Sequence, residues 1–330
     1  MTLTPSADTV ASGAEAPFFE LLVSAKLALA RDVWGFELRH PLGTDLPPAT
    51  AGAHLTVQVP SGPRRNYSLH GDPADSGCYR IAVKRDASGR GGSVRMVDAV
   101  QQGDLIAVST PRNNFELHPR AHEFLFIAGG IGITPILSMV RHLLATQRAT
   151  FRLIYCTRDA ANTAFLQDLG APELAGRVRI HHDHGDPGQG FDFWPVFESP
   201  GKAHVYCCGP RGLMDAVADM SGHWPTGNIH FESFGADVSA FAANTAFTVH
   251  LKKSGTTVPV GADQSILEAL RQRGHHVPSS CESGTCGSCR TGLLAGEPEH
   301  RDMVLGPDEQ ATQIMVCVSR ARSAELVLDL

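Results

Sequence analysis

Three cysteines within nine residues are the feature of this sequence that is best suited to chemistry. Cys281, Cys286 and Cys289 follow the pattern C-x4-C-x2-C, and Cys317 follows at a distance in the strand-like run QIMVCVSRA. The residues between the first three cysteines are small or polar, with Glu282 as the one acidic residue. Because the thiolate is the metal-binding form of cysteine, four cysteines in this pattern indicate a metal centre.

The spacing predicts a [2Fe–2S] cluster of the plant type, whose two irons need four cysteine ligands. The small residues between the ligands leave room for backbone N–H groups to turn towards the sulfides of the cluster. A structural zinc site is the alternative. Zinc ligands usually occur as two C-x2-C pairs, however, and Cys317 stands alone.

A second motif is the segment AGGIGITPILSM at residues 128–139, which follows an apolar strand-like run and opens a predicted helix. Its glycines allow close approach to a pyrophosphate, and the N-terminus of the helix would face that anion. We expect Thr134 to cap this helix. The pattern departs from the three-glycine dinucleotide fingerprint and also fits a plain tight turn. The candidate nucleotide contacts are Gly130, Gly132, Thr134 and Pro135.

The segment CCGP at residues 207–210 ends another strand of the same predicted sheet. Ligands of open α/β sheets bind at such strand ends, so Cys208, Gly209 and Pro210 are further candidates. The thiol of Cys208 is expected to lie near a bound ring.

A third motif consists of two segments, RRNYSL and GRGGSV, in the first third of the chain. Arg65 offers a charged fork to a phosphate, Tyr67 a flat surface for a planar ring, and Ser68 a hydroxyl for a ring heteroatom. The glycines open a predicted helix at residues 94–99, which presents N–H groups to an anion. Taken alone, the segments also fit a barrel edge and a hairpin turn. The candidate contacts are Arg65, Asn66, Tyr67, Ser68, Lys84, Gly91, Gly92 and Ser93.

The pattern of apolar runs predicts three domains that would position these residues. Residues 18–119 contain many short strand-like runs, which predict an antiparallel barrel. In residues 120–234 strands alternate with helices, which predicts a doubly wound α/β domain around a parallel sheet. A linker is predicted at 235–245. Residues 246–330 begin with a hairpin and a helix that we expect Asp263 to cap and Gly274 to end.

Composition excludes some classes of protein. The chain has 330 residues, 42% of them hydrophobic, so it can form more than one core. Lys and Arg total 28 against 34 Asp and Glu, a formal net charge of -6, so no overall positive field exists to hold nucleic acid. We therefore expect no nucleic-acid partner.

We expect residues 1–17 to form a flexible tail, because they are rich in Thr, Ser, Ala and Gly. They have neither the basic start nor the apolar core of a signal peptide. The most apolar stretch, 124–140, is shorter than the ~20 residues of a membrane helix and contains three glycines and Pro135. Without an export signal, the eight cysteines favour metal or redox chemistry over disulfides. A cytoplasmic protein without a membrane partner is expected.

Together, and in this order, these segments resemble the phthalate dioxygenase reductase family of the ferredoxin-NADP reductase superfamily. The resemblance covers nearly the whole chain after Pro17. It rests on R-x-Y-S at residues 65–68, GGS at 91–93, the GGIGITP and CGP segments, FESF at 231–234, and the cluster cysteines followed by CVSRA.

The resemblance implies a flavin in the barrel, FMN rather than FAD, with NADH in the middle domain and one [2Fe–2S] cluster in a C-terminal β-grasp ferredoxin domain. It implies that Phe234 covers the flavin ring and that Ser68 and Cys208 adjoin the reacting rings as catalytic residues. NADH is expected over NADPH, also because Asp159 would repel a 2′-phosphate, although Arg158 would attract one.

The implied function is that of an oxidoreductase that takes hydride from NADH onto the flavin and passes single electrons to the cluster. Its partner would be a Rieske-type oxygenase or O-demethylase acting on aromatic or related small compounds, and the chain is expected to be a monomer. One alternative is a reductase of the same architecture that serves a cytochrome P450. The other is a redox-silent nucleotide-binding protein whose cysteines hold zinc.

Overall fold

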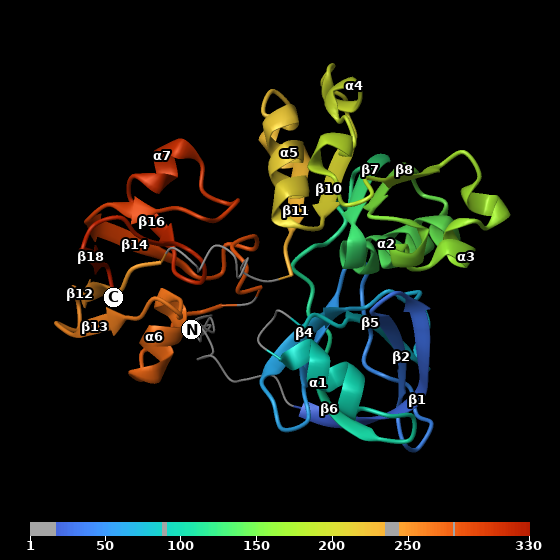
Figure 1. Ribbon diagram of the computed structural model, residues 1–330, viewed down its shortest axis with the longest axis horizontal. Helices are drawn as coiled ribbons and strands as arrows, with labels where there is room; N and C mark the ends of the chain where they lie inside the picture. Colours follow the sequence, from blue (N-terminus) through green and yellow to red (C-terminus); the bar gives the residue numbers. More distant parts are fainter. Residues whose placement is uncertain (1–17, 88–90, 235–243, 280) are drawn as a thin grey trace, which may run out of the picture.

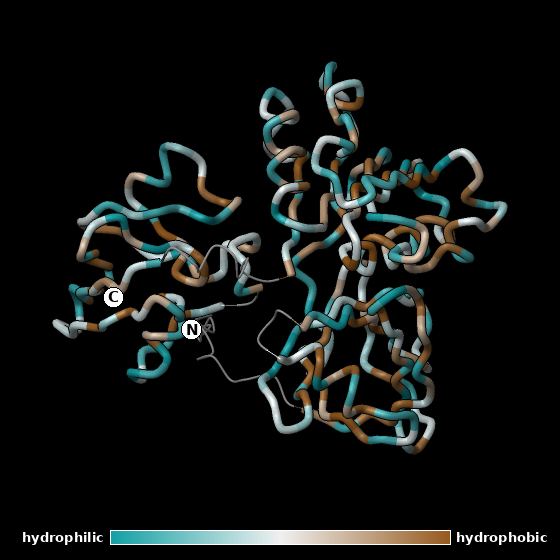
Figure 2. Tube along the Cα trace, viewed as in Figure 1, coloured by the Kyte–Doolittle hydropathy of each residue, from teal (hydrophilic) through white to brown (hydrophobic). Residues whose placement is uncertain are grey.

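The computed structural model describes residues 18–87, 91–234, 244–279 and 281–330. Within these ranges the chain forms three main sheets, each built from one of the three predicted stretches of sequence (Figure 1). Hydrophobic stretches follow the strands of all three sheets (Figure 2). The fold class predicted from the sequence is confirmed.

The first sheet is an antiparallel barrel with the strand order β4-β3-β6-β1-β2-β5. A bridge between Leu69 and Ile81 joins its two edges. Residues that alternate along the strands, such as Leu55 and Val57, are fully buried inside. Its elements are β1 (Phe18–Ala30), β2 (Val33–Arg39), β3 (His54–Gln58), β4 (Arg64–Ser68), β5 (Tyr79–Lys84), α1 (Gly92–Ala99) and β6 (Leu105–Ser109).

The second sheet is parallel, with the order β11-β10-β7-β8-β9. Its strands are β7 (Glu123–Gly129), β8 (Thr150–Thr157), β9 (Val178–His182), β10 (His204–Cys208) and β11 (Ile229–Glu232). Helices α2 (Ile133–Thr146) and α3 (Leu166–Leu169) cover one face, and α4 (Trp194–Phe197) and α5 (Arg211–Ser221) cover the other. Short 3-10 turns are η1 (Gly130–Gly132), η2 (Ala160–Asn162), η3 (Pro172–Leu174), η4 (Pro187–Gln189) and η5 (Thr226–Asn228). The direction of winding reverses between β7 and β10, and ligands bind at such a switch point.

The third sheet is mixed, with the order β13-β12-β18-β14-β16, and β12 runs parallel to β18. Helix α6 packs its apolar side against the sheet. The elements are β12 (Phe247–Leu251), β13 (Thr257–Val260), α6 (Ile266–Gln272), β14 (Arg290–Ala295), β15 (Pro298–Glu299), α7 (Pro307–Gln310), β16 (Gln313–Met315), β17 (Arg320–Ala321) and β18 (Glu325–Leu328).

The start of α6 differs from the prediction. Ser265, not Asp263, caps this helix: the N–H of Glu268 donates to Ser265 Oγ (3.1 Å), and the N–H of Ser265 donates to Glu268 Oε2 (2.9 Å). This reciprocal pair is a capping box, which satisfies two N–H groups at once. Gly274 ends the helix as expected, with a φ of 78°.

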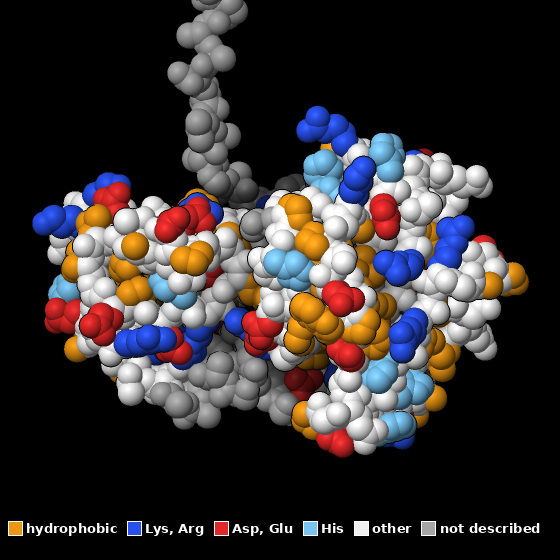
Figure 3. Space-filling view, turned by 90° about the horizontal axis from the view of Figure 1, so that it is seen from above, with side chains coloured by type: hydrophobic (Ala, Val, Ile, Leu, Met, Phe, Trp, Pro, Cys, Tyr) orange, Lys and Arg blue, Asp and Glu red, His pale blue; other side chains and the backbone are white. Residues whose placement is uncertain are grey.

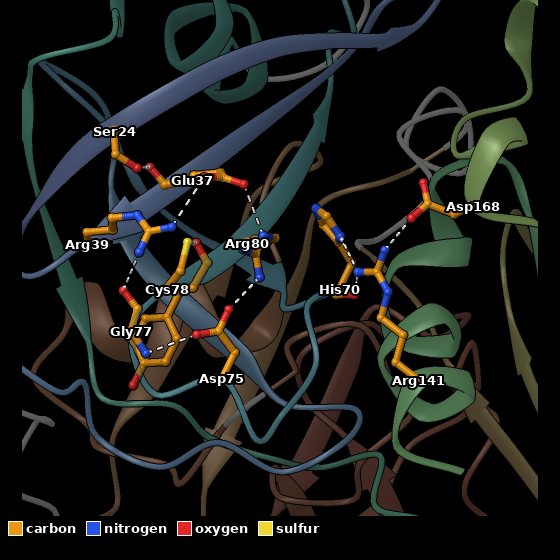
Figure 4. Close-up of polar contacts among 11 residues, drawn as sticks. Ser24, Glu37, Arg39, His70, Asp75, Gly77, Cys78, Arg80, Arg141 and Asp168 are labelled. Carbon is orange, nitrogen blue, oxygen red and sulfur yellow. Dashed lines mark hydrogen bonds and ion pairs between the residues drawn. The ribbon is translucent and has the colours of Figure 1, made fainter. Parts of the chain in front are cut away.

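The barrel and the parallel sheet share a continuous hydrophobic core, which contains Val33 and Ala82 from the barrel and Phe126 and Tyr155 from the sheet. Polar contacts reinforce this junction (Figure 4). Arg141 on α2 donates to the backbone oxygen of His70 (2.5 Å) and pairs with Asp168 (2.6 Å). The barrel and the parallel sheet are therefore closely joined.

Two predicted segments lie largely outside the described residues. These are the tail at 1–17 and the linker at 235–245, of which the structure describes the last two residues. We propose the division into units at 18–119, 120–234 and 246–330. In the described ranges, no helix has the length and apolar character needed to cross a membrane.

Candidate functional site

Strand β4 carries Tyr67 and Ser68, which as neighbours on a strand point to opposite sides of it. Ser68 is buried, and the buried hydroxyl of Tyr67 has no hydrogen-bond partner in the described part of the chain. Burial raises the pKa of Tyr67 to about 12, so the phenol keeps its proton. Since buried polar atoms are normally paired, this hydroxyl is ready to bind a polar molecule.

Arg65, two residues earlier on β4, lies against the N-terminus of α1. A Cβ atom added at Gly92 would lie 2.9 Å from Arg65 Nε. Gly91 is the N-cap of the helix with a φ of 78°, and no side chain caps the first turn. A guanidinium and uncapped N–H groups therefore converge where an anion can bind.

The other barrel candidates have different surroundings. The hydroxyl of Thr56 donates to Asn66 Oδ1 (2.8 Å), so the Asn66 amide contacts strand β3. The Ser93 hydroxyl accepts the N–H of Asp86 (3.1 Å), which links residue 86 to the first turn of α1. Lys84 is exposed at the end of β5. Tyr67, Ser68, Arg65 and Gly92 are therefore the main candidates for a binding site in the barrel.

At the switch point, the loops after β7 and β10 touch through glycines. A Cβ atom at Gly132 would lie 2.1 Å from the Cys208 oxygen, and one at Gly209 would lie 3.0 Å from Gly129 Cα. Close backbone approach of this kind forms a cradle for a phosphate at the start of a helix. Pro135 lies in the first turn of α2, and Pro210 precedes α5.

The predicted capping role of Thr134 is wrong. Gly132 is the N-cap of α2, and the Thr134 hydroxyl donates back to the Ile131 oxygen (3.0 Å). The cap lies two residues earlier than predicted, which places Thr134 inside the helix. No side chain caps the helix, and the N–H of its first residue, Ile133, donates to the Gly130 oxygen of the preceding turn η1.

Cys208 ends β10 beside Glu232, which ends β11. The Cys208 thiol is fully buried, and burial raises its pKa well above the usual range, so it stays protonated. Glu232 is buried, and within the described ranges its Oε2 has no partner. Burial first, and the charge of Cys281 second, raise the pKa of Glu232 to about 8.

Glu232 was not predicted as a site residue. The available signal was an acidic residue in IHFESF, a strand of otherwise neutral residues. Phe234, two residues further on, is 45% exposed at the end of the described segment.

The four cluster cysteines form two pairs. The N–H of Cys281 donates to Cys286 Sγ (3.4 Å), and the hydrogen bond from the Cys286 thiol lowers the pKa of Cys281 to about 4. A hydrogen bond from Cys317 likewise lowers the pKa of Cys289. Two pairs of sulfurs match two irons with two protein ligands each.

The cysteine loop is tightly turned, and its cysteines form no disulfides. Among the described residues, no group of three or more His, Cys, Asp or Glu side chains is arranged to hold a single metal ion. All eight cysteines are free of disulfides. Gly284 and Gly287 have φ values of 76° and 79°, which turn the loop tightly around the cluster position.

The cysteine loop lies close to both other sheets. The charge of Cys281 acts on Glu232 in the parallel sheet and on His54 in barrel strand β3. His54 is buried, and burial followed by the charge of Arg112 lowers its pKa to about 4. The cluster loop, the nucleotide loops and the barrel thus converge.

Comparison with known proteins identifies the family. The model of the 2Fe-2S iron-sulfur cluster binding domain matches residues 249–322, and that of the oxidoreductase NAD-binding domain matches residues 126–219. Phthalate dioxygenase reductase of Burkholderia cepacia is 58% identical over 95% of this chain and 98% of the relative. This chain belongs to the phthalate dioxygenase reductase family.

Other comparisons agree. The phthalate 4,5-dioxygenase oxygenase reductase subunit of Pseudomonas putida is 59% identical over 95% of this chain and 97% of its own. A solved structure of phthalate dioxygenase reductase, described as modular for electron transfer from pyridine nucleotides to [2Fe-2S], matches with a TM-score of 0.76 over 95% of this chain and 98% of that one. An intact type IV self-sufficient cytochrome P450 monooxygenase is 37% identical with a TM-score of 0.69, over 94% of this chain and 41% of that one.

As a member of the phthalate dioxygenase reductase family, this chain is an oxidoreductase with flavin, NAD and [2Fe–2S] sites. The residues present fit all three groups. The unpartnered Tyr67 hydroxyl suits a flavin, the glycine cradle with Glu232 suits a pyridine nucleotide, and the paired cysteines suit the cluster.

Proposed function

We propose that this protein is the NADH-dependent reductase of a Rieske-type oxygenase or O-demethylase that acts on an aromatic or related small compound. The observation that carries the proposal is the convergence of the three sites. Cys281 of the cluster loop lies within electrostatic range of both Glu232, beside Cys208, and His54 of the barrel. The names of related reductase subunits support an oxygenase as the partner.

In this proposal the flavin is FMN. Arg65 and the N-terminus of α1 form one anion site, which suits the single phosphate of FMN. Tyr67 would lie against the flavin ring and use its protonated hydroxyl as a donor, and Ser68 would face a ring heteroatom. Asn66, Lys84 and Ser93 would support this site from its margins.

The nucleotide is NADH. The loop at Gly130–Pro135 would hold the pyrophosphate, and Cys208, Gly209 and Pro210 would lie against the nicotinamide. Asp159 follows β8 and accepts the N–H of Asn162 (3.0 Å), so its carboxylate is fixed where the ribose of a dinucleotide is expected. A fixed negative charge there would repel the 2′-phosphate of NADPH.

The protein's own residues keep the site neutral and closed. A flavin accepts hydride from NADH and can pass its electrons on singly. Cys208 holds its proton because of burial and presents an uncharged thiol to the nicotinamide side. Phe234 would cover the flavin ring and exclude water. We propose a monomer located in the cytoplasm, where NADH is available and cysteines stay reduced.

The test is spectroscopic and then functional. The purified protein should be brown, absorb beyond ~400 nm and bleach on addition of NADH, as flavin and cluster chemistry requires. It should then support turnover by a Rieske-type oxygenase. A colourless protein with stoichiometric zinc would overturn the proposal.

A second candidate function is the supply of electrons to a cytochrome P450, which the similarity to the self-sufficient monooxygenase favours. Purified Rieske and P450 acceptors, compared at equal concentration, decide between the two. Faster reduction of the P450 acceptor would replace the Rieske partner with this alternative and leave the NADH–flavin–cluster path in place.

A further inference from the structure

The [2Fe–2S] unit has a hydrophobic core of its own. Every residue of that core lies between Phe247 and Leu330, whereas one core runs through both the barrel and the parallel sheet. In the view of Figure 3 the [2Fe–2S] unit forms a lobe on the left, beside the rest of the molecule on the right. The position of the cluster therefore depends on the contacts between the lobes.

One such contact starts next to the nucleotide loop. Arg211, the first residue of α5, follows Pro210 directly. Its Nη1 donates to the backbone oxygen of Arg301 (2.8 Å), and its Nε donates to Asp215 (2.7 Å), which fixes the orientation of the guanidinium. A charge-assisted hydrogen bond thus joins α5 to the [2Fe–2S] unit.

The second contact between the lobes is apolar and is made by Met303, two residues after Arg301. The Met303 side chain packs against the hydrophobic cluster on the α5 side of the parallel sheet, which includes Met214 and Val217. Met303 is thus a half-buried side chain of the [2Fe–2S] unit that packs against the core of another unit. Its burial removes apolar surface from water only when the lobes are joined.

The same short segment is fastened to the cluster loop. The N–H of Met303 donates to the oxygen of Gly284 (3.0 Å), which lies between Cys281 and Cys286. A Cβ atom at Gly284 would lie 3.1 Å from Asp302 Cα, so the two backbones are in close contact. Asp302 also accepts the N–H groups of Val304 and Leu305, which stiffens the segment.

We propose that Arg211 and Met303 are positioning residues that dock the segment 301–303, and through it the cluster loop, against the NAD-binding sheet for electron transfer from flavin to cluster. This inference rests on the proposed electron path. The step is a one-electron transfer in which no bond forms or breaks: the reduced flavin loses one electron and the cluster gains it. Its rate falls steeply with distance, so a loosened lobe would slow it.

The test compares Arg211→Ala, Met303→Ala and the double variant with the unaltered holoenzyme by stopped-flow spectroscopy. Flavin reduction by NADH should keep its rate, and electron transfer from flavin to cluster should slow by about tenfold in the double variant, the factor that about 1.4 kcal/mol represents. Arg211→Lys should restore part of the rate, because lysine can still donate to the Arg301 oxygen. Met220→Ala, a change of an exposed methionine on α5, is the matched control.

Two readouts separate docking from other effects. Small-angle scattering should show a larger radius of gyration for the double variant, while the electron paramagnetic resonance spectrum of the reduced cluster stays unchanged. If the variants transfer electrons to the cluster as fast as the unaltered protein, or lose flavin reduction to the same extent, the docking role is wrong. If the unaltered protein does not reduce its flavin with NADH, the proposed function itself fails.

Discussion

Two single atoms lie where this protein is proposed to receive ligands. Among the described residues five buried side-chain atoms lack a hydrogen-bond partner, and the Tyr67 hydroxyl and Glu232 Oε2 are two of them; the others are His118 Nδ1, Arg148 Nε and His300 Nδ1. An unpaired buried polar atom costs about 1–3 kcal/mol, which a bound ligand could offset at the first two positions. One lies at the predicted flavin site and the other beside Cys208 at the nucleotide site.

Arg65→Ala should weaken flavin retention. It removes a charge-assisted contact to the flavin phosphate worth roughly 1.5 kcal/mol, which corresponds to about tenfold weaker binding. The flavin content after gel filtration and the dissociation constant from ultrafiltration measure the effect. Arg64→Ala is the control, since neighbouring residues of a strand point to opposite faces. Unchanged flavin content in Arg65→Ala would remove Arg65 from the site.

At the scale of elements, two loops and one helix start form the nucleotide cradle. The loops after β7 and β10 meet without side chains, at Gly129, Gly132 and Gly209. The sheet brings these loops together because β7 and β10 are adjacent and parallel. Any side chain at the contact would separate them.

Gly132→Ala should weaken NADH binding and lower the Tm. The new Cβ would lie 2.1 Å from the Cys208 oxygen, so backbone must move, at a cost of about 1–3 kcal/mol. Titration with NADH and thermal unfolding measure both effects. Gly212→Ala, in helix α5 with open space around it, is the control and should be neutral or slightly stabilising. Equal NADH affinity in both variants would contradict the proposal that the glycine contact at Gly132 forms part of the NADH site.

A contact between secondary-structure elements joins the end of β4 to helices α2 and α3. The His70 ring packs on Phe165 with centroids 4.7 Å apart, and Arg141 binds the His70 backbone (Figure 4). His70 is buried, and burial first, then the charges of Arg141 and Arg80, lower its pKa to about 3. The ring is therefore neutral in the folded protein.

This burial predicts a loss of stability in acid. The unfolded chain protonates His70 near its ordinary pKa of 6.5, and the folded chain does so only near 3, so between these values the unfolded state binds more protons. Stability should fall as the pH drops below about 6.5, by up to about 1.4 kcal/mol per pH unit from this residue. His70→Gln should flatten the dependence of Tm on pH between 7.5 and 5. Exposed His223→Gln is the control, and equal slopes for the parent and His70→Gln would refute the prediction.

At the scale of the whole molecule, the electron path crosses from one lobe to the other. The proposed flavin and nicotinamide contacts all precede residue 235, and the proposed cluster ligands all follow residue 280. The first lobe has its own shared core and does not depend on the cysteine loop for its packing. The two halves of the path should therefore be separable by mutation.

Cys286→Ala should remove or cripple the cluster and leave the other two sites occupied. NADH should still reduce the flavin, and ferricyanide, which takes electrons directly from flavin, should still be reduced. Cytochrome c and the native oxygenase should lose most of their electron supply. Cys156→Ala, outside the cluster loop, should keep all activities.

Two outcomes would contradict the serial path. Loss of flavin reduction in folded Cys286→Ala protein would place the cluster within the hydride-transfer site. Oxygenase turnover that persists in Cys286→Ala would show that the electrons do not pass through the cysteine loop.

The sequence by itself determined the chemistry and the class of each unit. The C-x4-C-x2-C spacing, the glycines after an apolar strand and the alternation of short runs are local patterns, and each restricts local backbone geometry and ligand type. The three sheets and the cysteine pairs follow these patterns. The sequence also contains the signal for the start of α6, since Ser265 and Glu268 have the capping-box spacing. Asp263, two residues earlier, is a competing cap candidate in the sequence.

Only the tertiary structure decided which distant residues meet. Glu232 reaches Cys208 because β10 and β11 pair in one register, and His54 reaches the cluster loop because the lobes dock. The contact of Arg211 with residue 301 likewise joins segments ninety positions apart. Such contacts depend on strand order, register and lobe packing, which sum many weak interactions along the chain, and no short stretch of sequence encodes them.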